Sequence, residues 1–119
     1  MMLLTRKKLK QILEQGRKFT PEIFQKSDVI LFPQPGVYFL HDKNTGRSYA
    51  GRSETDVYQQ ITKQLEGRGK TQIYMDLRHG ADIEITVINE PDIKRQKQIL
   101  NALNKRYGIN KCGYGASRY

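Results

Sequence analysis

Residues 36–51 most constrain the fold of this 119-residue chain, because their pattern predicts a β-hairpin. The segments 36–40 (GVYFL) and 48–50 (SYA) have β-strand character, and HDKNTGR lies between them. Within that connection Asn44, Thr45 and Gly46 favour a tight turn, because these residue types adopt or stabilise turn conformations. A short hairpin pairs its two strands antiparallel, so we expect an antiparallel sheet.

Helical signals and one further strand surround the hairpin. Periodic apolar positions and capping residues predict helices over 5–15, 20–26, 53–67, 71–78 and 91–107. The third of these helices is expected to begin at a capping box formed by Ser53 and Asp56. The alternating segment 82–88 (DIEITVI) predicts a third strand. This order predicts an α+β fold, with a small antiparallel three-stranded sheet flanked by helices.

Two prolines, Pro33 and Pro35, form a stiff connector in the first third of the chain. They divide it into a helical N-terminal extension, residues 1–33, and a main domain, residues 34–119. The total length suits one hydrophobic core, so we expect the extension to pack onto the main domain.

The charge balance points to an anionic partner. The chain carries 21 Lys and Arg against 12 Asp and Glu, a net charge of +9, which suits nucleic acid, an acidic protein or a membrane surface. No segment approaches the ~18 apolar residues of a membrane span. The apolar residues 1–4 precede the basic ones, the reverse of a secretory signal, so we expect an intracellular protein, cytoplasmic or nucleoid-associated. The single cysteine, Cys112, excludes an internal disulfide.

The hairpin carries a motif, in which Gly36-Val37-Tyr38 is followed after ten residues by Tyr49-Ala50-Gly51. It resembles the motif that names the GIY-YIG endonuclease superfamily, and the order of elements over about 34–115 is similar too. The resemblance implies a GIY-YIG-like fold. Members of the superfamily cleave DNA phosphodiesters with a divalent metal, which agrees with the need of this reaction for a charge clamp.

The resemblance also implies roles for individual positions. The two motif tyrosines belong near the metal-bound water, a helix arginine binds the phosphate, and a glutamate on the last helix holds the metal. These catalytic positions fall on Tyr38, Tyr49, Gln59 or Gln60, and Arg95 or Gln96. The remaining motif positions fall on Gly36, Gly51 and Asn110.

The two charged groups that the chemistry needs are therefore replaced by other residue types. Loss of one preorganised charge stabiliser commonly lowers the rate ~10²–10³-fold, so we expect an impaired nuclease, with no metal site and no cofactor. The alternative is an active endonuclease that uses Mg²⁺, with Glu54, Glu90 or a partner chain supplying the missing acid. A third possibility is a protein-binding modulator of a host enzyme or a tRNA–protein complex.

The basic residues near the motif suggest a surface that follows phosphates. We expect its members to be Arg52, Lys63, Arg68, Lys70, Lys94 and Lys97. The expected partner is nucleic acid, DNA rather than RNA, with an acidic protein as the alternative and no membrane.

Overall fold

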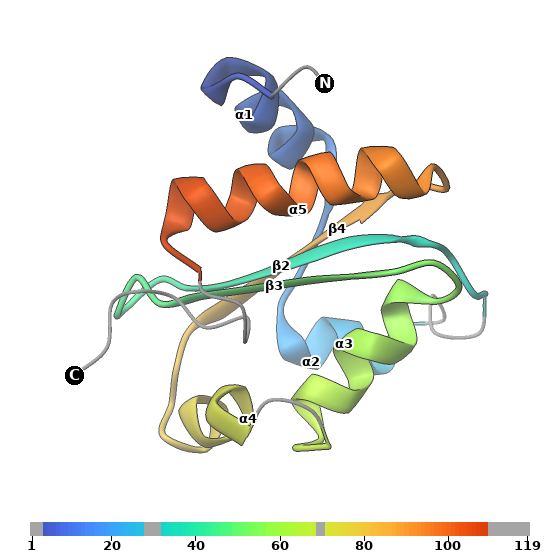
Figure 1. Cartoon of the computed structure of the whole chain (residues 1–119). Coiled ribbons are helices and arrows are strands. Elements are labelled where there is room, and N and C mark those ends of the chain that lie inside the picture. Colours follow the sequence, from blue (N-terminus) through green and yellow to red (C-terminus); the bar gives the residue numbers. More distant parts are fainter. Residues whose placement is uncertain (1–3, 28–31, 69–70, 110–119) are drawn as a thin grey trace.

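A four-stranded antiparallel sheet forms the middle layer of the protein (Figure 1). The computed structural model describes residues 4–27, 32–68 and 71–109. The strands are β1 (Arg17–Phe19), β2 (Gly36–Asp42), β3 (Ser48–Ser53) and β4 (Ile83–Asn89). Their order is β1-β4-β2-β3, so the first strand of the predicted hairpin lies in the interior of the sheet.

Helices cover both faces of the sheet. They are α1 (Arg6–Gln15), α2 (Pro21–Lys26), α3 (Val57–Leu65), α4 (Thr71–Arg78) and α5 (Ile93–Tyr107). Figure 1 shows α1 and α5 on one side of the sheet and α2, α3 and α4 on the other. Each side has its own apolar core, one around Val37, Ile99 and Leu103 and the other around Leu40 and Ile61. None of the described helices combines the length and apolar character that crossing a membrane requires.

The hairpin is confirmed, and its turn is held by a buried carboxylate. Asp42 is 2% exposed and accepts hydrogen bonds from the backbone N–H of Asn44 and the hydroxyl of Thr45. Gly46 adopts a φ of 77°, which favours glycine. In the resulting register, Tyr38 lies opposite Gly51 and Leu40 opposite Tyr49.

The sheet has four strands, whereas the sequence predicted three. The additional strand, β1, pairs with β4 from Arg17 opposite Val87 to Phe19 opposite Ile85. Only one of its three residues, Phe19, is buried, so it has too few positions to show an alternating pattern. The α+β class holds, and a strand from the segment 1–33 completes the sheet at the edge of β4.

Two helices begin later than predicted. The cap of α3 is Asp56, whose carboxylate accepts from the N–H of Tyr58, and Ser53 instead accepts from the N–H of Asp56 in the preceding turn. Helix α5 begins at Ile93, with Asp92 as its cap. In both places an aspartate satisfies the exposed N–H groups of the first turn.

Candidate functional site

The two motif glycines permit close approaches between strands. A Cβ atom on Gly51 would lie 2.5 Å from Tyr38 Oη and 2.6 Å from its Cζ. A Cβ on Gly36 would lie 2.2 Å from the carbonyl oxygen of Ile88. The spacing of the motif thus has a local cause, because the second glycine makes room for the first tyrosine across the hairpin.

Tyr38 is enclosed by the core between the sheet and α3. Its side chain belongs to the apolar cluster that contains Ile61 and Leu65, and the residue is 7% exposed. The amide Nε2 of Gln64, on α3, lies 3.4 Å from its hydroxyl oxygen. Burial raises the pKa of Tyr38 above its ordinary value, so this side chain is a neutral phenol at physiological pH.

Tyr49 takes part in a buried polar cluster with Arg47 and Asp76. Its hydroxyl donates to Asp76 Oδ2 at 2.5 Å, and Arg47 Nη1 lies 2.8 Å from Oδ1 and 3.0 Å from Oδ2 of the same carboxylate. The arginine and aspartate side chains are only 11% and 13% exposed. Burial, and next the hydrogen bond to Asp76, raises the pKa of Tyr49 above its ordinary value.

Asp76 is the residue of this cluster that the sequence did not reveal. It is the one acid of α4, and its partners Arg47 and Tyr49 lie 29 and 27 positions away in the chain. Arg47 neutralises the charge of Asp76. The same carboxylate accepts from the Tyr49 hydroxyl and thereby fixes the position of that side chain. Asp76 also lines a cavity of about 200 Å³ with Asp42, Thr45 and His79.

The glutamines predicted at the phosphate position lie on α3. Gln59 is exposed and Gln60 is partly buried. The contact with Tyr38 comes from Gln64 instead. Gln64 could have been identified from its spacing, because it falls on the same face of α3 as the apolar residues Val57 and Ile61 although its side chain is an amide.

The residues predicted at the metal position lie across the sheet from the tyrosines. Tyr38 and Tyr49 belong to the core on the α3 side, whereas α5 packs on the other face (Figure 1). Gln96 is 0% exposed, and its Nε2 donates to the carbonyl oxygen of Glu90 at 2.6 Å. Its Oε1 accepts from Arg52 Nη1 at 3.2 Å.

Arg95 points to a different place. It lines a cavity of about 330 Å³ between α1, the end of β4 and α5, together with Gln15, Arg17 and Glu90. The fold therefore does not bring Arg95 or Gln96 to the motif tyrosines.

These residues do not fit a divalent metal. Magnesium requires oxygen ligands that include carboxylates, and the one side-chain oxygen of Gln96 already accepts from a guanidinium. Glu54 pairs with Arg52 at 3.2 Å, and Glu90 accepts from the N–H of Asp92. Within residues 4–27, 32–68 and 71–109, no group of three or more His, Cys, Asp and Glu side chains is placed to hold an ion.

The predicted phosphate-binding residues are divided between the two faces. Lys94 and Lys97 are exposed on α5, and Lys63 lies in the last turn of α3. Arg68 forms an exposed ion pair with Glu66, and Arg52 contacts Glu54 and Gln96. Three further predicted features, Lys70, Asn110 and Cys112, lie outside the described residues.

Comparison of the chain with models of protein families, with curated proteins and with solved structures found no match in any of the three.

Proposed function

We propose that this protein binds nucleic acid through a GIY-YIG-like domain that has lost, or nearly lost, the ability to cleave it. The proposed loss of cleavage rests on the burial and hydrogen bonding of Gln96. The side chain at the expected metal position is fully buried and held at both ends of its amide, by Arg52 and by the carbonyl of Glu90. Such a group neither binds a cation nor reaches a phosphate.

The motif tyrosines support the same proposal. A tyrosine that assists hydrolysis must reach the attacking water or the phosphate. Tyr38 and Tyr49 are 7% and 1% exposed, and their hydroxyls contact Gln64 and Asp76. The raised pKa of each keeps it protonated, so neither supplies a phenolate base near neutral pH.

The net charge of +9 supports binding. We expect the full chain to shift a labelled 30-base-pair DNA duplex, with an affinity that falls steeply as salt rises. A duplex RNA of the same sequence is the parallel arm, and DNA is expected to bind more tightly. If the chain shifts neither the DNA nor the RNA duplex at about 50 mM salt, the proposal of binding is contradicted.

A second candidate, an active endonuclease, is favoured by one observation: the Asp76 carboxylate lies 2.5 Å from Tyr49 Oη. Plasmid nicking with Mg²⁺ or Mn²⁺ separates the two candidates. We expect no metal-dependent nicking, since Arg47 already holds both oxygens of Asp76. Nicking that disappears in both Tyr38→Phe and Asp76→Asn would show that the domain is an enzyme.

A further inference from the structure

Nearly all the excess charge of the chain lies in two helices. Helices α1 and α5 together carry nine lysines and arginines and a single carboxylate, Glu14. Their net charge is therefore +8, out of +9 for the whole chain. The nine cations of this α1–α5 layer are Arg6, Lys7, Lys8, Lys10, Lys94, Arg95, Lys97, Lys105 and Arg106.

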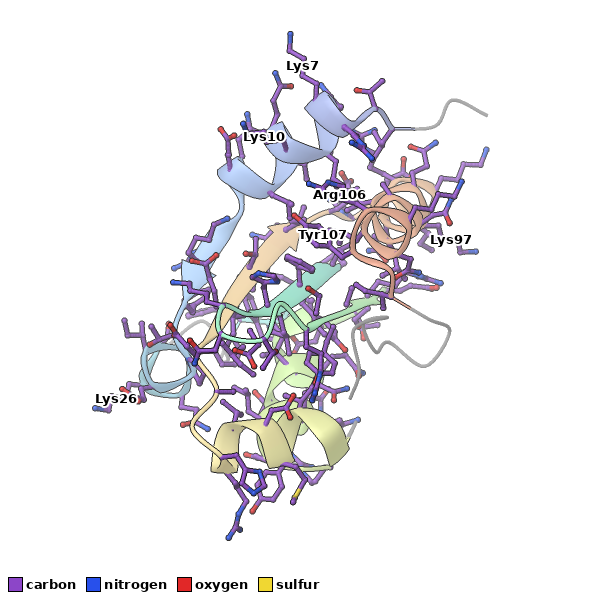
Figure 2. The ribbon with its side chains drawn as sticks, turned by 90° about the vertical axis from the view of Figure 1, so that its left-hand side faces the viewer. Lys7, Lys10, Lys26, Lys97, Arg106 and Tyr107 are labelled. Carbon is purple, nitrogen blue, oxygen red and sulfur yellow. The ribbon has the colours of Figure 1, made fainter. Side chains whose placement is uncertain are left out.

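Both helices lie on the same face of the sheet and share one core, to which Leu9 and Leu103 contribute. Figure 2 shows Lys7 and Lys10 extending from α1 and Lys97 from α5, all into solvent, while Lys26 lies on α2 across the sheet. The opposite face is nearly neutral. Helices α2, α3 and α4 carry three basic residues against two acidic ones.

Among the residues that the structure describes, no carboxylate forms an ion pair with a cation of the α1–α5 layer. Over the described part of the chain, the four ion pairs are formed by Lys43, Arg47, Arg52 and Arg68 with Glu84, Asp76, Glu54 and Glu66. None of them involves α1 or α5. Concentrated like charge without internal compensation raises the local potential and attracts a polyanion.

One stripe of α5 has the geometry of a surface that follows phosphates. Lys94, Lys97, Asn101 and Lys105 are spaced at i, i+3, i+7 and i+11 and are all exposed. At 1.5 Å per residue, the stripe extends roughly 16 Å along a straight helix. A rigid row of this kind presents its cations with little cost in backbone entropy.

We propose that the α1–α5 layer, and not the face with the motif tyrosines, is the surface that holds the backbone of a nucleic-acid duplex. This inference rests on the proposed function and places its interface. A protein partner fits less well, because stable protein interfaces have an apolar centre. The exposed large apolar side chains of the described residues are Ile23, Phe32, Met75 and Ile93, and only Ile93 belongs to this layer.

The test compares two variants that lose the same charge. The first replaces Lys94, Lys97 and Lys105 by Gln, and the matched control replaces Lys26, Lys43 and Arg78, which lie outside the layer. Binding of a fluorescent 30-base-pair duplex is measured by anisotropy between 50 and 300 mM salt. Thermal unfolding of both variants verifies that each is folded.

We expect the α5 variant to bind on the order of 10²-fold more weakly at about 100 mM salt, with a log–log salt slope reduced by about 2.7. The control is expected to stay within about twofold of the unaltered chain, with an unchanged slope. Equal losses in both variants would mean that net charge alone determines binding. Weaker binding in the control alone would place the interface on the other face of the sheet. Either result overturns the inference while leaving the proposed function intact.

Two further outcomes are decisive. If the unaltered chain binds no duplex at all, the proposed function fails and the inference with it. If polyglutamate at equal charge concentration displaces the labelled duplex as well as unlabelled duplex does, the layer recognises acidic polymers in general. The assignment to nucleic acid is then wrong.

Discussion

Replacement of Arg47 by Met tests whether the polar cluster around Tyr49 is a structural anchor. Arg47 and Asp76 are 11% and 13% exposed, so the variant leaves a nearly buried carboxylate without its counter-charge. Removal of one partner from a buried pair costs about 3–5 kcal/mol. Because Tyr49 still donates to Asp76, we expect the lower end, about 3 kcal/mol, in the free energy of unfolding.

The assay is urea unfolding followed by circular dichroism, with a thermal scan as a second readout. A loss of 3 kcal/mol corresponds to roughly 12 °C in the unfolding midpoint for a domain of this size. Arg68→Met is the matched control, because Arg68 pairs with Glu66 where their side chains are 60% and 48% exposed. That variant should lose less than about 1 kcal/mol.

A triple variant separates loss of charge from loss of packing. Replacing Arg47 by Met, Asp76 by Leu and Tyr49 by Phe removes every polar member together, and similar apolar replacements of buried pairs are often neutral. We expect its stability to lie within about 1 kcal/mol of the unaltered chain. If Arg47→Met costs no more than Arg68→Met, the cluster does not anchor Tyr49 and the reasoning is refuted.

Three other outcomes follow from the site. Gly51→Ala should lose about 1–3 kcal/mol in urea unfolding, because its Cβ would lie 2.5 Å from Tyr38 Oη, and a loss under about 0.5 contradicts this. Gln96→Leu should lose about 1–3 kcal/mol, because it removes two hydrogen bonds to partly buried partners, Arg52 and the carbonyl of Glu90, and an unchanged unfolding midpoint argues against the buried amide. The pKa of Tyr49 is raised in the folded state, so the protonated hydroxyl contributes fully to the free energy of unfolding below about pH 10, and this contribution is lost as pH rises further. Tyr49→Phe should therefore reduce the fall in stability between about pH 10 and 11.5, and an identical fall in both proteins refutes it.

The elements with strong local signals could be predicted from the sequence. The hairpin follows from its turn residues, and α1 and α2 end and begin where Gly16, Thr20 and Pro21 place them. Strand β1 could not be predicted, because its pairing with β4 joins segments about 70 positions apart.

The candidate site was predictable only in part, for the same reason. The motif positions Gly51 and Tyr38 face each other, as a hairpin requires. By contrast, Asp76 reaches Tyr49 only through the packing of α4 against the sheet, and nothing in the local pattern indicates that contact. The positions of Arg95 and Gln96 on the far side of the sheet depend on how α5 crosses it.

The two faces of the sheet therefore differ in charge balance. This difference separates the buried motif tyrosines on one face from the proposed interface on the other. On the α3 side, the charged groups near the motif tyrosines neutralise one another, as Arg47 and Asp76 do. On the α1–α5 side, a net charge of +8 has no internal partner among the described residues. Mutual repulsion among these cations opposes folding, and a bound polyanion removes that repulsion. Under the proposed function, the α1–α5 layer therefore binds without the motif tyrosines, and an impaired site on one face of the sheet does not weaken binding on the other.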